Sequence, residues 1–267
     1  MRKNRQKTIA RLALKFSLLI YLTMVNQVNA NNKEPACHLN YAWAQVPPYI
    51  IAGSPEPSGF QVDLLRWIAS ELDCHINFVE MNWQQSLHNL KTGQIDLVGR
   101  SSFNSDRNQF AYFSDAYATE VLVLYLRKGE KKQYAGADLN DLLKNDFRLG
   151  LLKGAYYGRE IEMILQSPEM SQAIQLYPFA EDMIVALEQN KIDGFFEAPY
   201  IMDNAAMAKR MKLGVEEYPV EIVTGDIHFM FSKSSVSKKL VKRFNLALAK
   251  VKESNRYLSH RYWSKVR

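Results

Sequence analysis

The segment from Asp96 to Tyr117 has the side chains that a receptor for a small anion would need. It reads DLVGRSSFNSDRNQFAYFSDAY. The apolar residues Ile95–Val98 predict a short strand, which leads into a loop with hydroxyl groups such as that of Ser102, and Arg107 follows. Hydroxyls, free backbone N–H groups and one planar guanidinium can together bind a carboxylate. Because ligands of α/β proteins bind where strands meet loops, we predict a small-carboxylate site here.

The first 30 residues have the pattern of a secretory signal peptide. An apolar run, Leu12–Val25, follows a basic start, and small residues stand before Asn31. The alternative is an uncleaved membrane anchor, but the run is short for a span of about 20 residues. We therefore expect cleavage after Ala30 and export. The basic residues of this segment are Arg2, Lys3, Arg5, Lys7, Arg11 and Lys15.

Loss of the signal peptide changes the charge balance of the chain. The full sequence has 34 Lys and Arg against 28 Asp and Glu. Six of the basic residues and none of the acidic ones lie in the signal, so 28 of each remain. This balance does not favour a nucleic-acid partner. The 237 residues that remain of 267 are more typical of two lobes than of one.

The chain has two cysteines, Cys37 and Cys74. Each stands at the start of a predicted strand, and parallel neighbouring strands would bring the two thiols side by side. Disulfides persist in exported proteins, so we predict a Cys37–Cys74 bridge. The alternative is a pair of buried free thiols.

Strands and helices alternate along the chain, which predicts an α/β fold. A second α/β set follows the first after residue 126, and two apolar runs, Glu120–Leu126 and Asp226–Phe231, cross between the sets. We therefore predict two mostly parallel sheets joined by two hinge strands. Residues 31–126 and 226–267 form lobe 1, residues 127–225 form an inserted lobe 2, and the cleft between them is the expected ligand site. The elements expected in the first set are Cys37–Trp43, Phe60–Leu72, His75–Glu80, Trp83–Lys91 and Ile95–Val98.

Seven short motifs, given with their positions at the end of this paragraph, follow one another along the chain as they do in the family 3 extracellular solute-binding proteins, which the chain resembles. These are the periplasmic receptors for polar amino acids in ABC-type import. The resemblance spans most of residues 37–267 and is more specific in the first lobe than in the second. It implies a two-lobe periplasmic binding-protein fold. The motifs are PPY (Pro47–Tyr49), GFQVDLL (Gly59–Leu65), the spaced pattern ending in IDL (Trp83–Leu97), SDR-x5-FSDAY (Ser105–Tyr117), LGLLKG (Leu149–Gly154), KIDGFF (Lys191–Phe196) and RYW (Arg261–Trp263).

The resemblance also implies roles for individual residues. Arg107 takes the place of the arginine that binds the ligand α-carboxylate, and Ser102 that of a hydroxyl residue that assists it. Trp83 takes the place of an aromatic residue that covers the ligand side chain. The loop after the first strand of the second lobe, with Tyr156 and Tyr157, supplies hydrogen-bond donors, as helix starts commonly do for anions.

The sequence departs from the family pattern where the family has acids for the ligand ammonium. Trp43 stands at the end of the first strand, where an acid is common, and Ala198 stands at the second such position, beside Glu197. Glu197 can substitute if the strand end is shifted. Arg100 occupies a position that is usually small, and would add a second cation if it points into the cleft. A large aromatic in place of an acid favours stacking or cation–π contact with a flatter or differently charged ligand.

A structural role stays open for each candidate from sequence alone. Arg107 could be a solvated loop residue, Ser102 a turn cap, and Trp83 or Trp43 a core residue. Glu197 could be a surface acid. One tyrosine of the pair at 156 and 157 is expected to serve packing, and Arg100 could point outward.

The function that the resemblance implies is capture of a small carboxylate, amino-acid-like ligand between two lobes in the periplasm, without catalysis. We expect a monomer that a membrane permease or sensor recognises, and no cofactor. One alternative is a periplasmic enzyme of the same fold, similar to cyclohexadienyl dehydratase, with Glu197 as a general acid. Another is a sensory or interaction lobe with an altered ligand. No metal is expected, because the five histidines show no ligand spacing; they are His38, His75, His88, His228 and His260.

Overall fold

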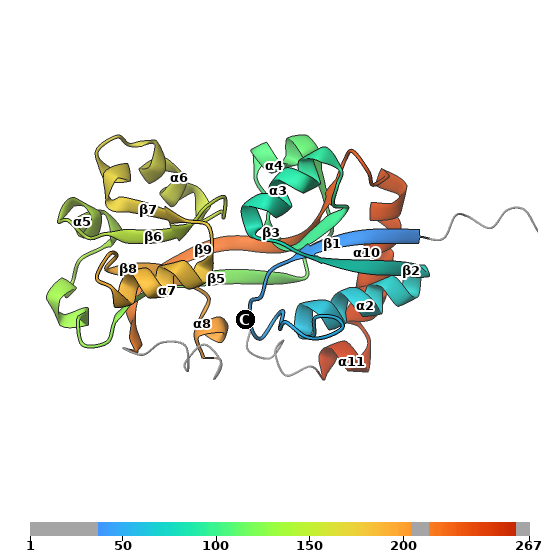
Figure 1. The fold of residues 1–267 in the computed structure, drawn as a ribbon, viewed down its shortest axis with the longest axis horizontal. Coiled ribbons are helices and arrows are strands. Elements are labelled where there is room, and N and C mark those ends of the chain that lie inside the picture. The colour runs from blue at the N-terminus through green and yellow to red at the C-terminus, as the bar shows by residue number, and fades with distance from the viewer. Residues whose placement is uncertain (1–36, 204–213, 260–267) are drawn as a thin grey trace, which may run out of the picture. The chain divides into compact units, whose positions relative to one another are not determined.

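The computed structural model describes residues 37–203 and 214–259 (Figure 1). The predicted signal peptide and the RYW motif lie outside the described residues. The sequence also predicts a helix over residues 199–210, and residues 204–210 of it lie outside the described residues. Within the described ranges, no helix has the length and apolar character needed to cross a bilayer. Within the same ranges, no cluster of three or more His, Cys, Asp or Glu side chains could hold a metal ion.

The strands of the described residues form one hydrogen-bonded order, β2-β1-β3-β9-β5-β8-β6-β7, with β4 beside β9. The pairs β1–β3, β6–β7 and β6–β8 are parallel, as the alternation of elements predicted. The two expected sheets are thus two strand groups that β9 and β5 connect through antiparallel pairing. The strands are β1 (Cys37–Trp43), β2 (Cys74–Glu80), β3 (Leu97–Ser102), β4 (Ala111–Phe113), β5 (Ala118–Arg127), β6 (Leu149–Leu152), β7 (Ile174–Tyr177), β8 (Gly194–Glu197) and β9 (Val215–Ser232).

The strands β5 and β9 run side by side between the two groups (Figure 1). Their pairing extends from Ala118 opposite Ile227 to Arg127 opposite Val215, with register shifts after Glu120 and after Val123. The sequence predicted β5 from its apolar run, but it predicted the return strand only from Asp226 onward. The sequence did not predict a strand over residues 215–225, because exposed charged residues interrupt any apolar run there. The lobe boundaries at residues 126 and 225 stay a prediction.

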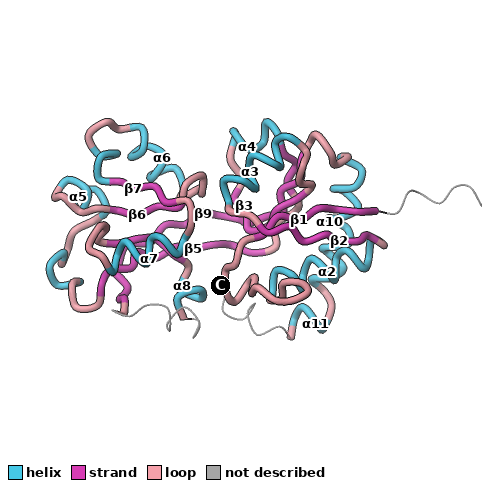
Figure 2. The backbone as a smooth tube through the Cα atoms, in the orientation of Figure 1, coloured by secondary structure: helices cyan, strands magenta, loops and turns pink. Residues whose placement is uncertain are grey.

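Helices cover both faces of each strand group. In the first group α3 and α4 lie on one face and α2 and α11 on the other, and in the second group α6 and α7 lie on opposite faces (Figure 2). The predicted helices at 60–72 and 83–91 are confirmed. The helices are α2 (Phe60–Leu72), α3 (Trp83–Thr92), α4 (Ser105–Phe110), α5 (Leu139–Lys144), α6 (Gly158–Gln166), α7 (Ala180–Glu188), α8 (Pro199–Met202), α10 (Lys238–Lys252), α11 (Asn255–Leu258) and the 3₁₀ turns η1 (Lys131–Tyr134) and η2 (Met170–Ala173).

Local sequence signals set the start and end of α3. The Asn82 side chain accepts a hydrogen bond from the backbone N–H of Gln85, whose own side chain accepts one from the Asn82 N–H. This capping box satisfies two of the free donors at the helix start. The helix ends at Gly93, whose left-handed conformation suits glycine. The start of α3 is therefore held firmly, and Trp83 is its first residue.

The packing of α3 on the sheet carries Trp83 to the edge of the core. A fully buried cluster joins Leu90 of α3 to Ala42, Val98 and Met230 of three strands, and Trp83 packs against this cluster while partly exposed. Trp83 thus has the packing role that the sequence left open. Part of its side chain is not covered by the core and stays exposed to solvent.

The predicted disulfide is confirmed. Both cysteines of the chain are disulfide-bonded, so Cys37 is linked to Cys74. Cys37 begins β1 and Cys74 begins β2, and these strands are neighbours in the sheet. The bridge therefore covalently joins the starts of two neighbouring strands of the first group.

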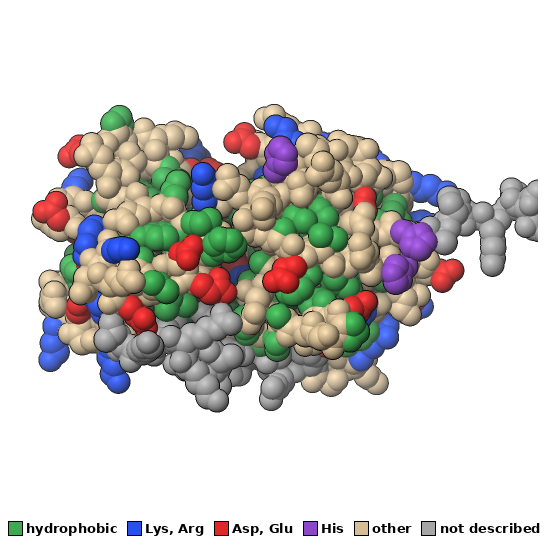
Figure 3. Space-filling model, in the orientation of Figure 1, with side chains coloured by type: hydrophobic (Ala, Val, Ile, Leu, Met, Phe, Trp, Pro, Cys, Tyr) green, Lys and Arg blue, Asp and Glu red, His purple; other side chains and the backbone are tan. Residues whose placement is uncertain are grey.

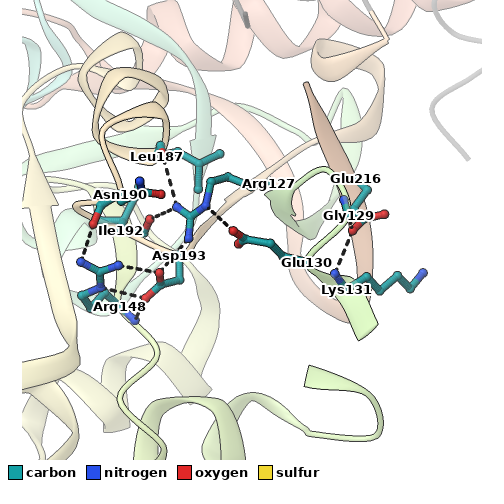
Figure 4. Close-up of polar contacts among 10 residues, drawn as sticks. All are labelled: Arg127, Gly129, Glu130, Lys131, Arg148, Leu187, Asn190, Ile192, Asp193 and Glu216. Carbon is teal, nitrogen blue, oxygen red and sulfur yellow. Dashed lines mark hydrogen bonds and ion pairs between the residues drawn. The ribbon is translucent and has the colours of Figure 1, made fainter. Parts of the chain in front are cut away.

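A buried charge cluster holds the far end of β5 (Figure 4). Asp193, just before β8, accepts hydrogen bonds from Arg127 at 2.9 Å and from the Arg148 Nε at 2.8 Å and backbone N–H at 2.9 Å. Arg127 also donates to the carbonyl oxygen of Leu187 and the carboxylate of Glu130. Burial alone would raise the pKa of Asp193, but the hydrogen bonds from Arg148 and Arg127 lower it below its ordinary value. The cluster fastens β5 to the second strand group.

We predict that Asp193→Ala lowers the free energy of unfolding by about 3 kcal/mol, because it removes the carboxylate that Arg127 and Arg148 share and leaves buried guanidinium donors without their acceptor. Urea unfolding measures the change. The matched control is Glu56→Ala, which removes the exposed partner of Arg66 and should cost less than about 1 kcal/mol. Equal effects of the two variants would show that the cluster does not stabilise β5.

Candidate functional site

One pocket in the described part of the chain is lined by residues from both strand groups and from β5. It lies at the ends of β1, β3 and β8, beside the start of α3, the loop after β6 and the start of α7. All eight residues that the sequence singled out line this pocket: Trp43, Trp83, Arg100, Ser102, Arg107, Tyr156, Tyr157 and Glu197. Their proximity is a result of the structure, and their role in binding stays a prediction.

Arg107 is a buried cation at the wall of this pocket. It lies on the short helix α4, where the Asn104 side chain caps the helix by accepting from the Arg107 backbone N–H at 2.8 Å. Its guanidinium donates to the carbonyl oxygens of Ser102 at 2.9 Å and Gly154 at 3.0 Å. Burial lowers the pKa of Arg107 to about 10, so the side chain is charged at neutral pH. Three of its five N–H donors are without partners among the described residues.

The carbonyl oxygen of Gly154 receives a second donor from the first strand group. The Trp83 Nε1–H donates to it at 2.9 Å, and the Arg107 guanidinium lies 5.3 Å from the Trp83 ring, within cation–π range. Gly154 has a φ of +80°, a conformation that favours glycine. The loop after β6 therefore contacts α3 and α4 directly. Through these hydrogen bonds to Gly154, the two strand groups touch at the pocket.

The two tyrosines of this loop differ in their surroundings. Tyr157 is buried, its hydroxyl accepts a hydrogen bond from the Leu152 backbone N–H at 3.0 Å, and burial raises its pKa. Tyr156 is only half-buried. Since Tyr157 supports the loop from inside, it is the packing member that the sequence expected in this pair, and Tyr156 is the more accessible one.

Trp43 ends β1 at the base of the pocket. Its side chain is buried, with 7% of the residue exposed, and its indole Nε1–H has no hydrogen-bond partner among the described residues. Buried polar groups in folded proteins nearly always have such a partner. The core role that the sequence left open therefore applies to Trp43, whereas stacking on a ligand stays a prediction. Its unused N–H donor belongs to a residue that lines the pocket.

Arg100 points toward the pocket, which the sequence could not decide. Its backbone has a left-handed conformation, with a φ of +49°, and its side chain is 19% exposed. Its Nη2 lies 3.0 Å from the carboxylate of Glu120, and its guanidinium lies 5.0 Å from the ring of Tyr49. A second cation therefore lines the pocket, with an acid beside it.

The sequence interpretation missed Glu120 and Glu181 as site residues, although both line the pocket. Glu120 is the single acid in the apolar run of β5, and a charged residue at the start of such a run was a signal that could have identified it. Glu181 lies in the first turn of α7. Figure 3 shows acidic side chains over and beside α7.

Glu197 ends β8 at the same wall, and its Oε1 accepts a hydrogen bond from the Ala198 backbone N–H at 2.9 Å. Burial raises the pKa of Glu197 from its ordinary value of 4.5 to about 7; Arg100 opposes this shift, and Glu120 and Glu181 add to it. Three carboxyl groups thus line the pocket although Trp43 and Ala198 stand at the positions where the resemblance led us to expect acids. The pocket combines two guanidiniums with three carboxyl groups.

Comparison with known proteins identifies the class to which this fold and pocket belong. An ancestral arginine-binding protein bound to arginine matches with a TM-score of 0.69 and 18% identity over 86% of this chain and 97% of its own. A histidine kinase sensor domain with similarity to periplasmic binding proteins also matches with a TM-score of 0.69, at 17% identity over 87% of this chain and 97% of its own. These matches show the two-lobe periplasmic binding-protein fold that the resemblance implied.

The sequence model of the bacterial extracellular solute-binding proteins, family 3, matches residues 40–263. The chain belongs to this family. Among curated relatives, the probable amino-acid-binding protein YxeM of Bacillus subtilis is 22% identical over 255 residues, which cover 93% of this chain and 92% of the relative. The family and these neighbours are binding proteins or sensor domains and not enzymes, so they do not favour the dehydratase alternative.

We predict that Glu197 makes the protein less stable as the pH rises from about 4.5 to 7. In this interval the folded protein keeps the Glu197 proton and the unfolded chain has lost it, so unfolding becomes more favourable. A change of pKa from 4.5 to about 7 lowers the free energy of unfolding by an amount on the order of 3 kcal/mol. Each tenfold change in the ionisation constant contributes about 1.4 kcal/mol. The loss is complete above pH 7.

The measurement is the difference in unfolding free energy between the wild type and Glu197→Gln at pH 4, 6 and 8. The variant should gain stability over the wild type as the pH rises. Glu253→Gln, an exposed residue at the end of α10, serves as the control. Parallel pH curves for the wild type and Glu197→Gln would contradict the raised pKa.

Proposed function

We propose that the protein binds a small amino-acid-like carboxylate in this pocket and delivers it to an ABC-type importer. The observation that carries the proposal is the Arg107 guanidinium, which is buried at the pocket wall with donors to spare. A buried guanidinium binds a carboxylate in a bidentate manner. The names of the relatives agree, since they bind amino acids or, in the solved structure, arginine.

The other charges of the pocket suit the opposite end of an amino acid. Glu181 and Glu197 line the same pocket as Arg107, together with Glu120, which pairs with Arg100. An ammonium group on the ligand would favour the ionised form of Glu197 and lower its pKa from about 7. Trp83 and Tyr156 offer apolar faces, and Ser102 lies on the strand that leads to Arg107. A zwitterion thus finds a cation and acids within one cavity.

The proposed mechanism is closure of two lobes on the ligand about hinges near residues 126 and 225. The contacts of Trp83 and Arg107 with Gly154 resemble a closed arrangement, because they join side chains of one strand group to the loop of the other. Gly225, with a φ of +88°, pairs with Glu120 next to a register shift in β5, and such a site can absorb a change of backbone angle. A ligand that contacts both lobes favours the closed state.

Location and partners belong to the same proposal. Family membership and the N-terminal pattern support export to the periplasm with cleavage after Ala30. We expect a monomer whose closed form is recognised by a membrane permease. The likeness to a histidine kinase sensor domain makes a membrane sensor the second candidate partner. Binding of the closed form to one of these partners in a pull-down would distinguish them.

We predict that Arg107→Ala lowers affinity for the bound amino acid about 100-fold, because hydrogen bonds to charged groups contribute about 1.5–3 kcal/mol each. Isothermal titration with a panel of amino acids and small carboxylates first identifies the ligand and then compares the variants. Arg66→Ala, which removes an exposed arginine paired with Glu56, should bind like the wild type. A folded Arg107→Ala protein with full affinity would refute the proposal.

A further inference from the structure

The side chain of Arg100 occupies a part of the pocket that a ligand side chain would otherwise reach. Arg100 follows Gly99 on β3, and both residues line the pocket together with Trp43 and Glu120. Its backbone N–H donates to the Tyr117 hydroxyl at 2.8 Å, which holds the strand end in place. A left-handed backbone is uncommon for a residue other than glycine, and such residues are found at ligand sites.

The acid beside Arg100 is already paired within the protein. Glu120 Oε1 accepts from Arg100 at 3.0 Å and from the Tyr200 hydroxyl at 3.4 Å, and its Oε2 accepts from the Thr224 hydroxyl at 3.3 Å. The Tyr200 ring in turn packs on the ring of Tyr49, at 4.8 Å between centroids. A cationic ligand side chain would therefore meet a carboxylate that already has its counter-charge, with the Arg100 guanidinium next to it.

Two donors at the same wall lack acceptors. Arg100 Nε and Trp43 Nε1 are buried and have no hydrogen-bond partner among the described residues. Both side chains line the one pocket, and Trp43 is more than nine-tenths buried. Buried donors are rarely left without partners. An acceptor atom of the ligand would supply the hydrogen-bond partner that these two donors lack.

We infer that Arg100, with Trp43, selects an amino acid whose side chain ends in an acceptor oxygen, as a carboxylate or carboxamide does, and excludes cationic side chains. The inference rests on the proposed function, since it assumes that the α-carboxylate binds at Arg107. It sets this protein apart from the structural relative that binds arginine, although the two share one fold.

The test is isothermal titration of the mature chain with glutamine, glutamate, norvaline, arginine and lysine. Glutamine or glutamate should bind at least tenfold more tightly than norvaline, which lacks the acceptor, and than arginine or lysine. The comparison of glutamine with glutamate distinguishes the carboxamide from the carboxylate. The inference would be overturned if norvaline bound with the same affinity as glutamine and glutamate. It would also be overturned if arginine or lysine bound more tightly than they do.

Variants locate the effect on these two side chains. Arg100→Met removes the guanidinium and leaves Glu120 free to pair with a ligand cation, so arginine should gain at least tenfold while the acceptor-bearing ligand loses at least tenfold. Trp43→Phe keeps an aromatic six-membered ring and removes the pyrrole ring with its N–H, and should weaken the acceptor-bearing ligand about tenfold more than it weakens norvaline. Trp67→Phe, on α2 and outside the pocket lining, is the matched control.

The outcomes separate this inference from the proposed function. If amino acids bind and Arg107→Ala abolishes binding, but Arg100→Met and Trp43→Phe change no preference, only the inference fails. If none of the five amino acids binds the wild type but another member of the wider panel does, only the inference fails, and if no member of that panel binds, both fail. The Trp43→Phe measurement keeps the test decisive if Arg100→Met does not fold.

Discussion

The antiparallel pairing of β5 with β9 is the constraint on which the other features of the molecule depend. These two strands are hydrogen-bonded to both strand groups, so each group is built outward from them. The pairing also places Glu120 and Thr224 opposite the end of β3, where Arg100 emerges. Because the Arg127 and Asp193 cluster anchors one end of β5, the acid at the other end is held at a defined place in the pocket wall.

The pocket is governed by charges that are partly withdrawn from water. Burying a charge is costly unless it is paired and hydrogen-bonded, and the structure meets this condition in different ways. Arg100 is paired with Glu120, Arg107 donates to two carbonyl oxygens, and burial raises the pKa of Glu197, which favours its neutral form. This balance leaves a site that can accept a zwitterion without an unpaired charge, which is consistent with a binding protein that has to release its ligand.

Much of the fold could be predicted because local signals and tertiary structure agree. The helices at 60–72 and 83–92 have apolar periodicity, and the second also has a capping box. The first half of β9 could not be predicted, since its alternation of exposed charged and buried residues becomes meaningful only beside β5. The same holds for Glu120: within an apolar run it reads as an interruption, and only the neighbouring strands reveal that it faces Arg100.

Motifs, periodicity and the cysteine count were enough to predict the family, the alternation of elements, the disulfide and eight of the residues that line one pocket. The sequence by itself did not determine how the charges of that pocket are paired. Only the folded chain shows that Arg100 pairs with Glu120 and that Glu197 lines the same pocket as Trp43. The physical reason is that a side chain's charge acts through distance and burial, which depend on strands far apart in the chain.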